Sequence, residues 1–410
     1  MSSKVIVHIS ADFPDSMAAT KTSSVANLIK ATDGYRHVVY SLNRVSLVSG
    51  IVAVDFGADR KAIAYGAPPK GIFLATYLDR VSDWILKDIQ TRGIPVDALH
   101  LHKFSVEGLV GQKVARSLKR PYIVNLWGDT DLKVIKYRPD LKATWKSILD
   151  QATLIIPHSP WVEERFDELF GLDRSKLMIL PAITQNEHFT PSRIITEPRF
   201  VTLFNLDVHK RKNLAALVAV IDRMSRRIPN ISLDIYGKGS PKTMFEVSHI
   251  VEKSKAKNVK LKGPLPSDGF TTILGDYVGF LMPTRRETFG MVFIEALFSG
   301  LPLLHTKRWG IDGFFADDEV GYACDPTSLD DIEAGIDRLL REQERFKRSI
   351  ASLHNRGGLD RFKRKTIAET YRAGLERVGS ERTAGAGFVR DRCCSMTAND
   401  ISMVFVEKRV

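Results

Sequence analysis

The chain has 410 residues, of which 44% are hydrophobic, 26% charged and 9% aromatic. These proportions are typical of soluble globular proteins and exclude a disordered chain, a collagen-like repeat and a disulfide scaffold, and the length suggests two or three domains at ~150 residues each. The formal net charge of +12 favours an anionic partner, which is a phosphorylated ligand, a nucleic acid or an acidic membrane surface.

The first half of the chain alternates short β-branched runs with longer amphipathic runs. The strand-like runs are Lys4–Ser10, His37–Leu42, Asp97–His102, Tyr122–Trp127 and Thr153–Ser159. The helix-like runs are Thr22–Ala31, Leu74–Thr91, Val106–Leu118, Leu141–Gln151 and Trp161–Phe170. Buried strands separated by helical segments of this length indicate βαβ units and a parallel sheet.

The same alternation then begins again after a polar segment, Thr184–Pro198, which has two prolines and no periodicity. The second set of strand-like runs is Arg199–Leu206, Ile231–Gly237, Asn258–Gly263, Tyr277–Pro283, Leu301–His305 and Gly321–Asp325. The helix-like runs are Asn213–Arg227, Lys242–Ser254, Val292–Ser299, Ser328–Arg341 and Phe362–Val378. We therefore expect two doubly wound, Rossmann-like α/β domains with ligands at the carboxyl ends of the strands.

The predicted domains are residues 1–190 and 191–378, followed by a loose tail at 379–410; whether the last helix crosses back to the first domain is left open. The three cysteines, Cys324, Cys393 and Cys394, form no pattern with metal-ligand spacing. No signal peptide is recognisable, and the apolar run Leu214–Ile221 is far shorter than the ~20 residues of a spanning helix. These features predict a reduced, cytoplasmic protein that does not cross a membrane.

The segment Pro283–Pro302, PTRRETFGMVFIEALFSGLP, is the most informative part of the sequence. An apolar strand leads through polar residues to Glu287, a helix begins near Gly290, and Glu295 follows on its second turn. A helix amino terminus suits a phosphate, because its N–H groups are unpaired and its dipole end is positive. The two carboxylates could accept hydrogen bonds from sugar and ribose hydroxyls on either side of it. Alternatively, Glu287 is a helix-terminal charge and Glu295 a solvated face residue.

This segment resembles the Glu-x7-Glu signature of glycosyltransferase family 4, whose members are retaining enzymes of the GT-B fold. Four weaker motifs agree with the family in order along the chain: VNLWGDTD, ILPAITQNEHFTP, KNLAALVAVI and DIYGKGSP. The resemblance covers about residues 4–378 and is strongest over 199–325. It implies two Rossmann-like domains facing across a cleft and transfer of a sugar from a nucleotide donor.

The resemblance also implies roles for residues on the donor side. Glu295 would bind the ribose hydroxyls, and Glu287 would contact the donor sugar. Backbone N–H groups of Phe289, Gly290, Met291 and Val292 would hold the distal phosphate, and Gly237 corresponds to a glycine turn. Lys212 would neutralise the departing diphosphate, although a solvated lysine at the start of a helix is its alternative. Asp207 stands where the family has an arginine, so Lys210 or Arg211 would supply the positive charge of that arginine.

The acceptor side departs further from the family pattern. The family's Gly-Gly loop is replaced by Ala11–Thr22, and its histidine in the first-domain turn is Trp127. Asp129 and Asp131 are expected to form a polar pair facing the acceptor hydroxyl, with a turn-and-cap role as the alternative. His102 is a candidate acceptor-side residue, for which a hydrogen-bonded structural histidine is the default.

The resemblance implies front-face attack by the acceptor, with the leaving phosphate accepting its proton, and no protein nucleophile. We expect no cofactor and no metal, because no Asp-x-Asp metal motif occurs at the donor end. The expected partners are a UDP- or GDP-sugar donor and a lipid-linked or oligosaccharide acceptor, in bacterial surface or exopolysaccharide synthesis. Residues 103–146 carry ten Lys and Arg against four Asp and Glu. This surface is either solvated or rests on anionic lipid as a peripheral membrane contact.

Two hypotheses compete with the hexosyltransferase. A basic α/β protein that binds nucleic acid would account for the charge, but the sequence shows no helix-turn-helix turn, aromatic-rich strand signature or zinc spacing, so we expect no nucleic acid partner. A nicotinamide dehydrogenase would have a G-x-G-x-x-G turn after the first strand, where this chain has Ala11–Asp15.

Overall fold

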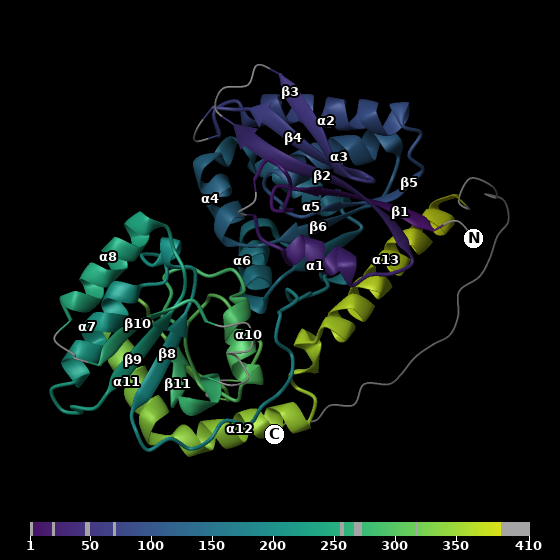
Figure 1. The fold of residues 1–410 in the computed structure, drawn as a ribbon. Helices are drawn as coiled ribbons and strands as arrows, with labels where there is room; N and C mark the ends of the chain where they lie inside the picture. The colour runs from purple at the N-terminus through teal and green to yellow at the C-terminus, as the bar shows by residue number, and fades with distance from the viewer. Residues whose placement is uncertain are drawn as a thin grey trace, which may run out of the picture.

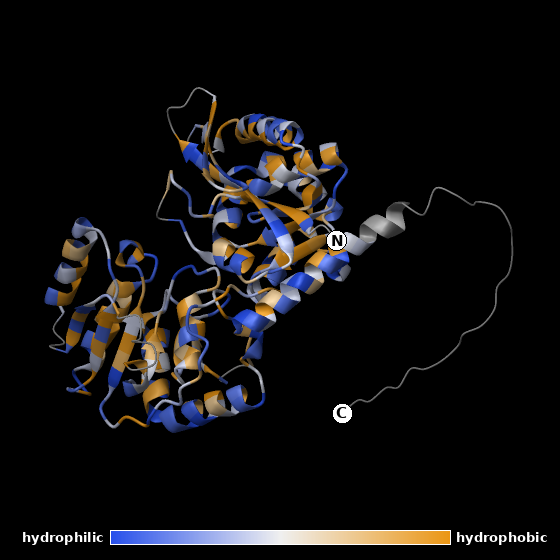
Figure 2. Ribbon diagram, turned by 45° about the vertical axis from the view of Figure 1, so that its right-hand side comes forward, coloured by the Kyte–Doolittle hydropathy of each residue, from blue (hydrophilic) through white to orange (hydrophobic). Residues whose placement is uncertain are grey.

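The computed structural model describes residues 3–18, 21–45, 50–68, 71–254, 258–265, 273–316 and 319–386 (Figure 1). The described residues form two α/β units, each built on a mainly parallel sheet. Apolar residues concentrate on the strands inside each unit, while the helices carry hydrophilic residues on their outer faces (Figure 2). The predicted fold class, two doubly wound domains, is confirmed. The predicted boundary at residue 190 falls in the segment between the two sheets, and stays a prediction.

The first sheet has seven strands in the order β3-β4-β2-β1-β5-β6-β7. Their bounds are β1 Lys4–Ser10, β2 Tyr35–Val45, β3 Ile51–Gly57, β4 Arg60–Gly66, β5 Val96–Leu101, β6 Tyr122–Leu126 and β7 Leu154–Pro157. All neighbours pair in parallel except β3 and β4, which form an antiparallel hairpin at one edge. The sequence analysis assigned no strand here. The strand β3 is largely exposed and lacks a buried run, and the buried run of β4, Ala62–Tyr65, contains two alanines, which are weak strand formers.

Helices cover both faces of this sheet. Their bounds are α1 Ser24–Lys30, α2 Leu74–Thr91, α3 Glu107–Leu118, α4 Asp129–Tyr137, α5 Lys142–Gln151 and α6 Pro160–Phe170. The sequence analysis assigned no helix to this segment and gave a turn-and-cap role for Asp129 and Asp131 only as the alternative. Asp129 and Asp131 occupy the first turn of this helix, where acidic side chains favour helix formation through the dipole.

The second sheet has six parallel strands in the order β10-β9-β8-β11-β12-β13, which is the order of a dinucleotide-binding fold. The strands are β8 Arg199–Leu203, β9 Ser232–Tyr236, β10 Val259–Gly263, β11 Gly279–Leu281, β12 Leu303–Thr306 and β13 Gly321–Cys324. The helices are α7 Leu214–Met224, α8 Pro241–Glu252, α10 Met291–Phe298, α11 Leu329–Arg341 and α12 Gln343–Asn355. Short 3-10 turns are η2 Pro139–Leu141, η3 Arg174–Lys176, η4 Leu206–Val208, η5 Leu274–Asp276 and η6 Asp360–Phe362.

The last helix, α13 Arg364–Ala386, returns to the first domain (Figure 1). Its buried residues Ile367, Tyr371 and Leu375 share a core with Ile6 of β1 and Ile123 of β6. The predicted loose tail from residue 379 is wrong for its first residues, because α13 continues to Ala386. A helix that has formed extends by one hydrogen bond per residue and needs no apolar stripe. The rest of the predicted tail lies outside the described residues.

No helix in the described part of the chain combines the length and the apolar character needed to cross a membrane.

Candidate active site

The predicted phosphate site is the loop between β11 and α10. Gly290 precedes the first residue of α10 and has a φ of 75°. A Cβ atom on this residue would lie 2.7 Å from Phe293 Cδ2 and 3.0 Å from Glu287 Cγ, so both the backbone conformation and the space require glycine. The loop can therefore turn sharply into the helix, with Glu287 close to the helix amino terminus.

Glu287 forms an ion pair with Lys212, which lies in the turn before α7. The two side chains are only 11% and 8% exposed, so the pair is buried. The carbonyl of Glu287 also accepts a hydrogen bond from the N–H of Gly310 at 2.9 Å. Sequence analysis proposed both residues for the donor site, and the structure brings them together although 75 positions separate them.

The loops that carry these two residues are joined through their backbones. The carbonyl of Arg211 accepts hydrogen bonds from the N–H of Arg285 at 2.9 Å and from Thr284 Oγ1 at 3.1 Å. Arg285 Nε also donates to Asn213 Oδ1 at 3.1 Å. The Lys212 turn and the Glu287 loop therefore form one supported unit at the carboxyl end of the second sheet.

Asp129 of the first domain reaches this unit. Its carboxylate lies 3.7 Å from Arg211 Nη1 and 3.4 Å from Arg286 Nη1, although Asp129 belongs to α4 and both arginines to the second domain. We call Asp129, Arg211, Lys212, Arg286 and Glu287 the charged cluster. With three basic and two acidic side chains, its formal charge is +1, which suits an anionic ligand.

The structure also separates the two cations that could replace the family's arginine. Lys210 is 81% exposed and points to Glu246 of α8, at 3.4 Å from its carboxylate. It therefore lies away from the charged cluster, and its donor-binding role stays a prediction. Arg211 is turned toward Asp129 instead. Arg286 was not proposed from the sequence, and its position beside Glu287 was the signal that could have found it.

A second set of contacts joins the domains on the carbonyl of Thr288, the residue after Glu287. This carbonyl accepts hydrogen bonds from Trp161 Nε1 at 3.0 Å and from Ser159 Oγ at 3.3 Å. Trp161 also packs on Trp309 of the second domain, with ring centroids 4.6 Å apart. The donor-side loop is thus held from both domains.

Glu295 lies on the second turn of α10 and is 8% exposed. Its Oε1 accepts a hydrogen bond from the N–H of Gln185, in the segment between the domains, at 2.9 Å. Burial raises the pKa of Glu295, against the opposing effect of hydrogen bonds from the Gln185 and Asn186 backbone. The structure therefore places Glu295 where the interdomain segment passes α10.

The remaining donor-side predictions depend on the backbone. The phenyl ring of Phe289 is buried against Phe314, so only its main chain can face a ligand. Met291 and Val292 begin α10, where N–H groups lack partners within the helix. Gly237 follows β9 in a tight packing site, because a Cβ atom there would lie 2.1 Å from the carbonyl oxygen of Phe204.

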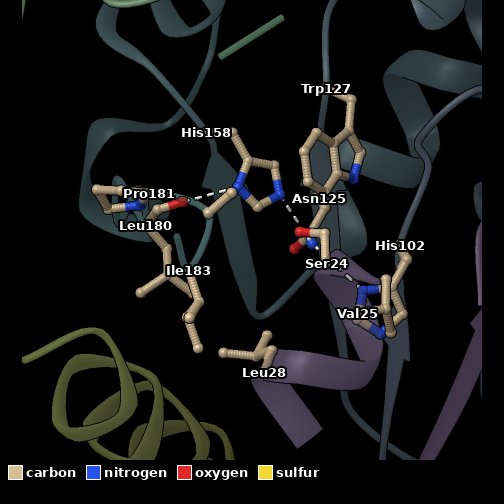
Figure 3. Close-up of a pocket in the computed structure, with 11 residues that line it drawn as sticks. Ser24, Val25, Leu28, His102, Asn125, Trp127, His158, Leu180, Pro181 and Ile183 are labelled. Carbon is tan, nitrogen blue, oxygen red and sulfur yellow. Dashed lines mark hydrogen bonds between the residues drawn. The ribbon is translucent and has the colours of Figure 1, made fainter. Parts of the chain in front are cut away.

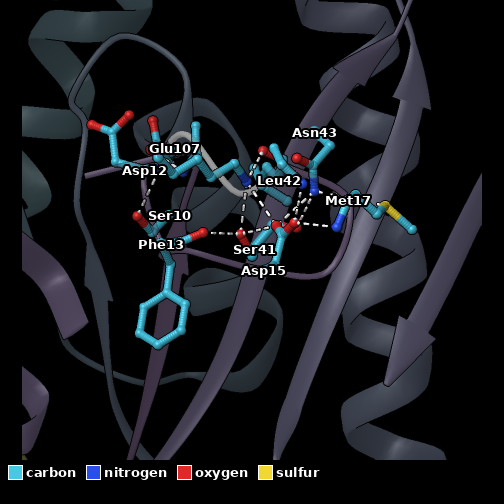
Figure 4. Close-up of polar contacts among 12 residues, drawn as sticks. Ser10, Asp12, Phe13, Asp15, Met17, Ser41, Leu42, Asn43 and Glu107 are labelled. Carbon is cyan, nitrogen blue, oxygen red and sulfur yellow. Dashed lines mark hydrogen bonds and ion pairs between the residues drawn. The ribbon is translucent and has the colours of Figure 1, made fainter. Parts of the chain in front are cut away.

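The loop that replaces the family's Gly-Gly turn is held on the first sheet by Asp15 (Figure 4). The Asp15 side chain is fully buried, and its Oδ2 accepts hydrogen bonds from Ser41 at 2.6 Å, Lys21 at 2.8 Å and Asn43 at 2.8 Å. Glu107, at the start of α3, accepts from the N–H of Ala11 at 2.7 Å. Burial raises the pKa of Glu107 to about 8.

Asp131 does not face a ligand. It is fully buried, and its two oxygens accept hydrogen bonds from the N–H groups of Ser105 at 2.9 Å and Trp127 at 3.2 Å. Burial raises the pKa of Asp131. The predicted polar pair is therefore divided, because Asp129 enters the charged cluster while Asp131 has the capping role that the sequence analysis gave as its alternative.

His102 is 1% exposed and belongs to a hydrogen-bonded chain that crosses five adjacent strands of the first sheet. The chain, here called the histidine relay, runs through His37, His8, His102, Asn125 and His100 to Tyr371 of α13, with a branch from Asn125 to His158. His102 is thus buried and hydrogen-bonded, as in the default that the sequence analysis gave for it, and its acceptor-side role stays a prediction.

One arrangement of protons satisfies every bond of the histidine relay with all five imidazoles neutral. The carbonyls of Thr32 and Leu180 can only accept, so His37 Nε2 and His158 Nδ1 carry protons. Each following bond then has one donor and one acceptor, ending with the Tyr371 hydroxyl donating to His100 Nδ1 at 2.7 Å. Burial lowers the pKa of His100 to about 4 and that of His158 to about 3.

The relay also contains a group with metal-like spacing. One ligand atom each from His8, His100 and His102 lies within 4.8 Å of the others. These nitrogens already serve the relay, so the hydrogen bonds account for their convergence. Beside them, a cavity of about 10 Å³ is lined by His102, Asn125, Trp127 and His158 (Figure 3). This volume holds at most one water molecule and therefore no acceptor.

Comparison with known proteins agrees with this geometry. Residues 184–352 match the family model of glycosyl transferases group 1, a segment that includes Lys212, Glu287 and Glu295. The structure resembles sucrose-phosphate synthase from Thermosynechococcus elongatus, with a TM-score of 0.65 and 18% identity, over 93% of this chain and 99% of that one. The fold is GT-B.

Two further similarities extend this result. The Anabaena protein HepE in complex with UDP has a TM-score of 0.60 and 14% identity, over 91% of this chain and 99% of its own. The GtfA subunit of the UDP-N-acetylglucosamine–peptide N-acetylglucosaminyltransferase of Streptococcus gordonii is 31% identical over 147 residues. That alignment covers 36% of this chain and 26% of the relative, so the chain spans about a quarter of that relative's length. Together the matches support a GT-B glycosyltransferase.

Proposed function

We propose that the chain is a retaining hexosyltransferase of glycosyltransferase family 4, which moves a sugar from a nucleotide donor to a lipid-linked or saccharide acceptor. The observation that carries the proposal is the buried ion pair between Lys212 and Glu287 at the amino end of α10. Buried ion pairs are costly to form, so a pair held where a helix can bind phosphate is better explained by function than by stability.

The charged cluster supports a role for each of its residues. Lys212 and Arg211 would neutralise the diphosphate as it departs, and Arg286 adds a third cation on the same loop as Glu287. Glu287 would exchange part of its contact with Lys212 for the hydroxyls of the donor sugar. Glu295, one helical turn further, would accept hydrogen bonds from the ribose.

The proposed reaction breaks the bond between the anomeric carbon and the phosphate oxygen. The acceptor oxygen attacks from the same face, and its proton passes to the leaving phosphate, so atoms and charges balance without a protein nucleophile. The chain's contribution is to stabilise charge on the phosphate and to position both substrates. Asp129, which approaches from the first domain, would orient the acceptor hydroxyl. We propose that no metal or cofactor takes part.

The comparisons support a proposal for the chemical class of the donor. The complex of HepE with UDP and the printed activity of the GtfA relative both favour a UDP-sugar over a GDP-sugar donor. A lipid-linked acceptor in surface or exopolysaccharide synthesis remains part of the proposal. Nothing in the described residues favours nucleic acid as the partner.

Transfer from a panel of UDP- and GDP-sugars tests the proposal, with product formation followed by mass spectrometry. Glu287→Gln and Glu295→Gln should each reduce turnover by at least a hundredfold, because each removes a charged acceptor from the donor site. Glu344→Gln on α12 is the matched control, since this residue is exposed and pairs only with Arg348 among the ion pairs described. Full turnover in both site variants would refute the proposal.

A further inference from the structure

An exposed apolar surface lies at one end of α4, away from the charged cluster. Ile72 is 51% exposed, Phe73 68% and Tyr137 68%, and we call these three residues the docking edge. A groove of about 500 Å³ runs along them, lined by Ala75 at the start of α2 and by Arg138 at the end of α4. Single exposed apolar residues are normal, but Ile72, Phe73 and Tyr137 line one groove, and such a contiguous apolar patch marks an interaction site.

The docking edge is built rigidly. Arg138, after α4, donates a hydrogen bond to the carbonyl of Gly71 and pairs with Asp140, with Nε and Oδ1 2.8 Å apart. The two ends of the edge are thereby joined. Phe73 has a φ of 53°, a left-handed conformation that is unfavourable for a phenylalanine. The structure thus holds a large apolar side chain in a strained backbone position that faces solvent.

The charge around the docking edge is basic. Lys136 and Lys142 are exposed and provide this charge, whereas Lys133 pairs with Asp129 at 3.3 Å and Arg138 pairs with Asp140. Aromatic residues at a membrane surface lie at the headgroup level, and nearby lysines are attracted to anionic lipid. The combination of an apolar tip and a basic flank therefore matches the surface of an anionic bilayer.

The helix α4 relates this edge to the proposed chemistry. It begins at Asp129, in the charged cluster, and ends at Tyr137, in the docking edge. Eight residue steps of 1.5 Å place the two ends about 12 Å apart along the helix. This distance is short enough for the headgroup of a membrane-bound acceptor to reach the charged cluster.

We propose that the docking edge binds the surface of an anionic phospholipid bilayer, with Phe73 and Tyr137 at the headgroup level. The inference rests on the proposed function, because it identifies the acceptor as lipid-linked and gives its direction of approach. Only Tyr137 of the docking edge lies within residues 103–146, for which the sequence analysis gave anionic lipid as one of two alternatives.

Vesicle co-sedimentation of the full chain tests this inference. Wild type should bind vesicles of equal phosphatidylglycerol and phosphatidylcholine, and binding should weaken as salt rises and be lost on phosphatidylcholine alone. The double variant Phe73→Asn/Tyr137→Asn should bind at least tenfold more weakly, and asparagine tolerates the left-handed backbone at position 73. Phe245→Asn is the matched control, because Phe245 is 77% exposed on α8 of the second domain.

Equal binding by wild type and the double variant would overturn the inference, as would an equal loss in Phe245→Asn or no binding by wild type. A dimer that the double variant abolishes, without vesicle binding, would overturn it in favour of a second copy of the chain. Thermal shift with UDP on the same samples separates the two proposals. Stabilisation by UDP without vesicle binding would refute only the proposal that the docking edge binds a membrane. Vesicle binding without UDP stabilisation or sugar transfer would refute the proposed function.

Discussion

Replacing Lys212 with methionine isolates the energetic role of the buried ion pair. Methionine keeps the apolar stem of the lysine and removes its ammonium group, which leaves Glu287 buried without that partner. Arg211 and Arg286 do not replace it, because both are directed to Asp129. Breaking a buried pair by removing one partner costs about 3–5 kcal/mol when the other charge remains.

The loss has an upper limit that depends on pH. The variant can protonate its unpaired carboxylate, and protonating an ordinary glutamic acid, which titrates near pH 4.3, costs about 4 kcal/mol at pH 7.5 and about 1.6 kcal/mol at pH 5.5. The unfolding free energy lost relative to wild type should therefore be about 3–4 kcal/mol at pH 7.5 and less than half of that at pH 5.5.

Urea-induced unfolding of wild type and Lys212→Met at both pH values measures this difference. The double variant Lys212→Met/Glu287→Gln should recover much of the stability at pH 7.5, because it removes the unpaired charge. A loss of the same size at both pH values, or no loss at pH 7.5, would show that the pair is not held in a buried environment.

Three further predictions concern other parts of the fold. Tyr371→Phe leaves His100 Nδ1 unpaired and should lower the unfolding free energy by about 1–3 kcal/mol. The control Tyr122→Phe should cost less, because the Ile148 carbonyl keeps its hydrogen bond from the N–H of Ala152. Equal losses of unfolding free energy in calorimetry would contradict this prediction. The relay histidines stay neutral in the folded chain, whereas the same histidines in the unfolded chain take up protons below about pH 6.5. The unfolding free energy should therefore fall as the pH drops from 6.5 toward 4, by up to about 1.4 kcal/mol per pH unit for each histidine. An unfolding free energy that does not change with pH in urea unfolding would contradict this prediction. Asp129→Asn should weaken the contact between the domains by no more than about 1 kcal/mol per ion pair, because both arginines are partly exposed. Small-angle scattering at low salt should then give a larger radius of gyration for the variant than for wild type. An unchanged radius of gyration would contradict a stabilising role for this contact.

The elements predicted best from the sequence were those with a continuous buried run or a regular apolar stripe. The strand Lys4–Ser10 and the helix Leu74–Thr91 have the bounds that the pattern indicated. The hairpin β3–β4 was missed, because β3 is an exposed edge strand without such a run and the buried run of β4 contains two alanines, which are weak strand formers. The helix α12 was missed because it begins directly after α11, with only Glu342 between them, and no turn residue separates the two.

The candidate site was predictable only in part. Local sequence could place Glu287, Gly290 and Glu295 around one helix terminus, since these residues lie within nine positions. The pairing of Glu287 with Lys212 and the approach of Asp129 depend on how distant loops pack, which no local pattern records. The same limit applies to His102, whose hydrogen-bond partners His8 and Asn125 come from the neighbouring strand β1 and from β6.

The return of α13 to the first sheet has a consequence for how the chain can be divided. Topologically, the second domain is an insertion within the first, because residues near both ends of the described chain complete a single core. An excised fragment that stops before residue 190 would lack one wall of that core and expose Ile6, Ile123 and Ile156 to water. The inserted unit carries its own core, so we expect it to be the part of the chain that folds alone.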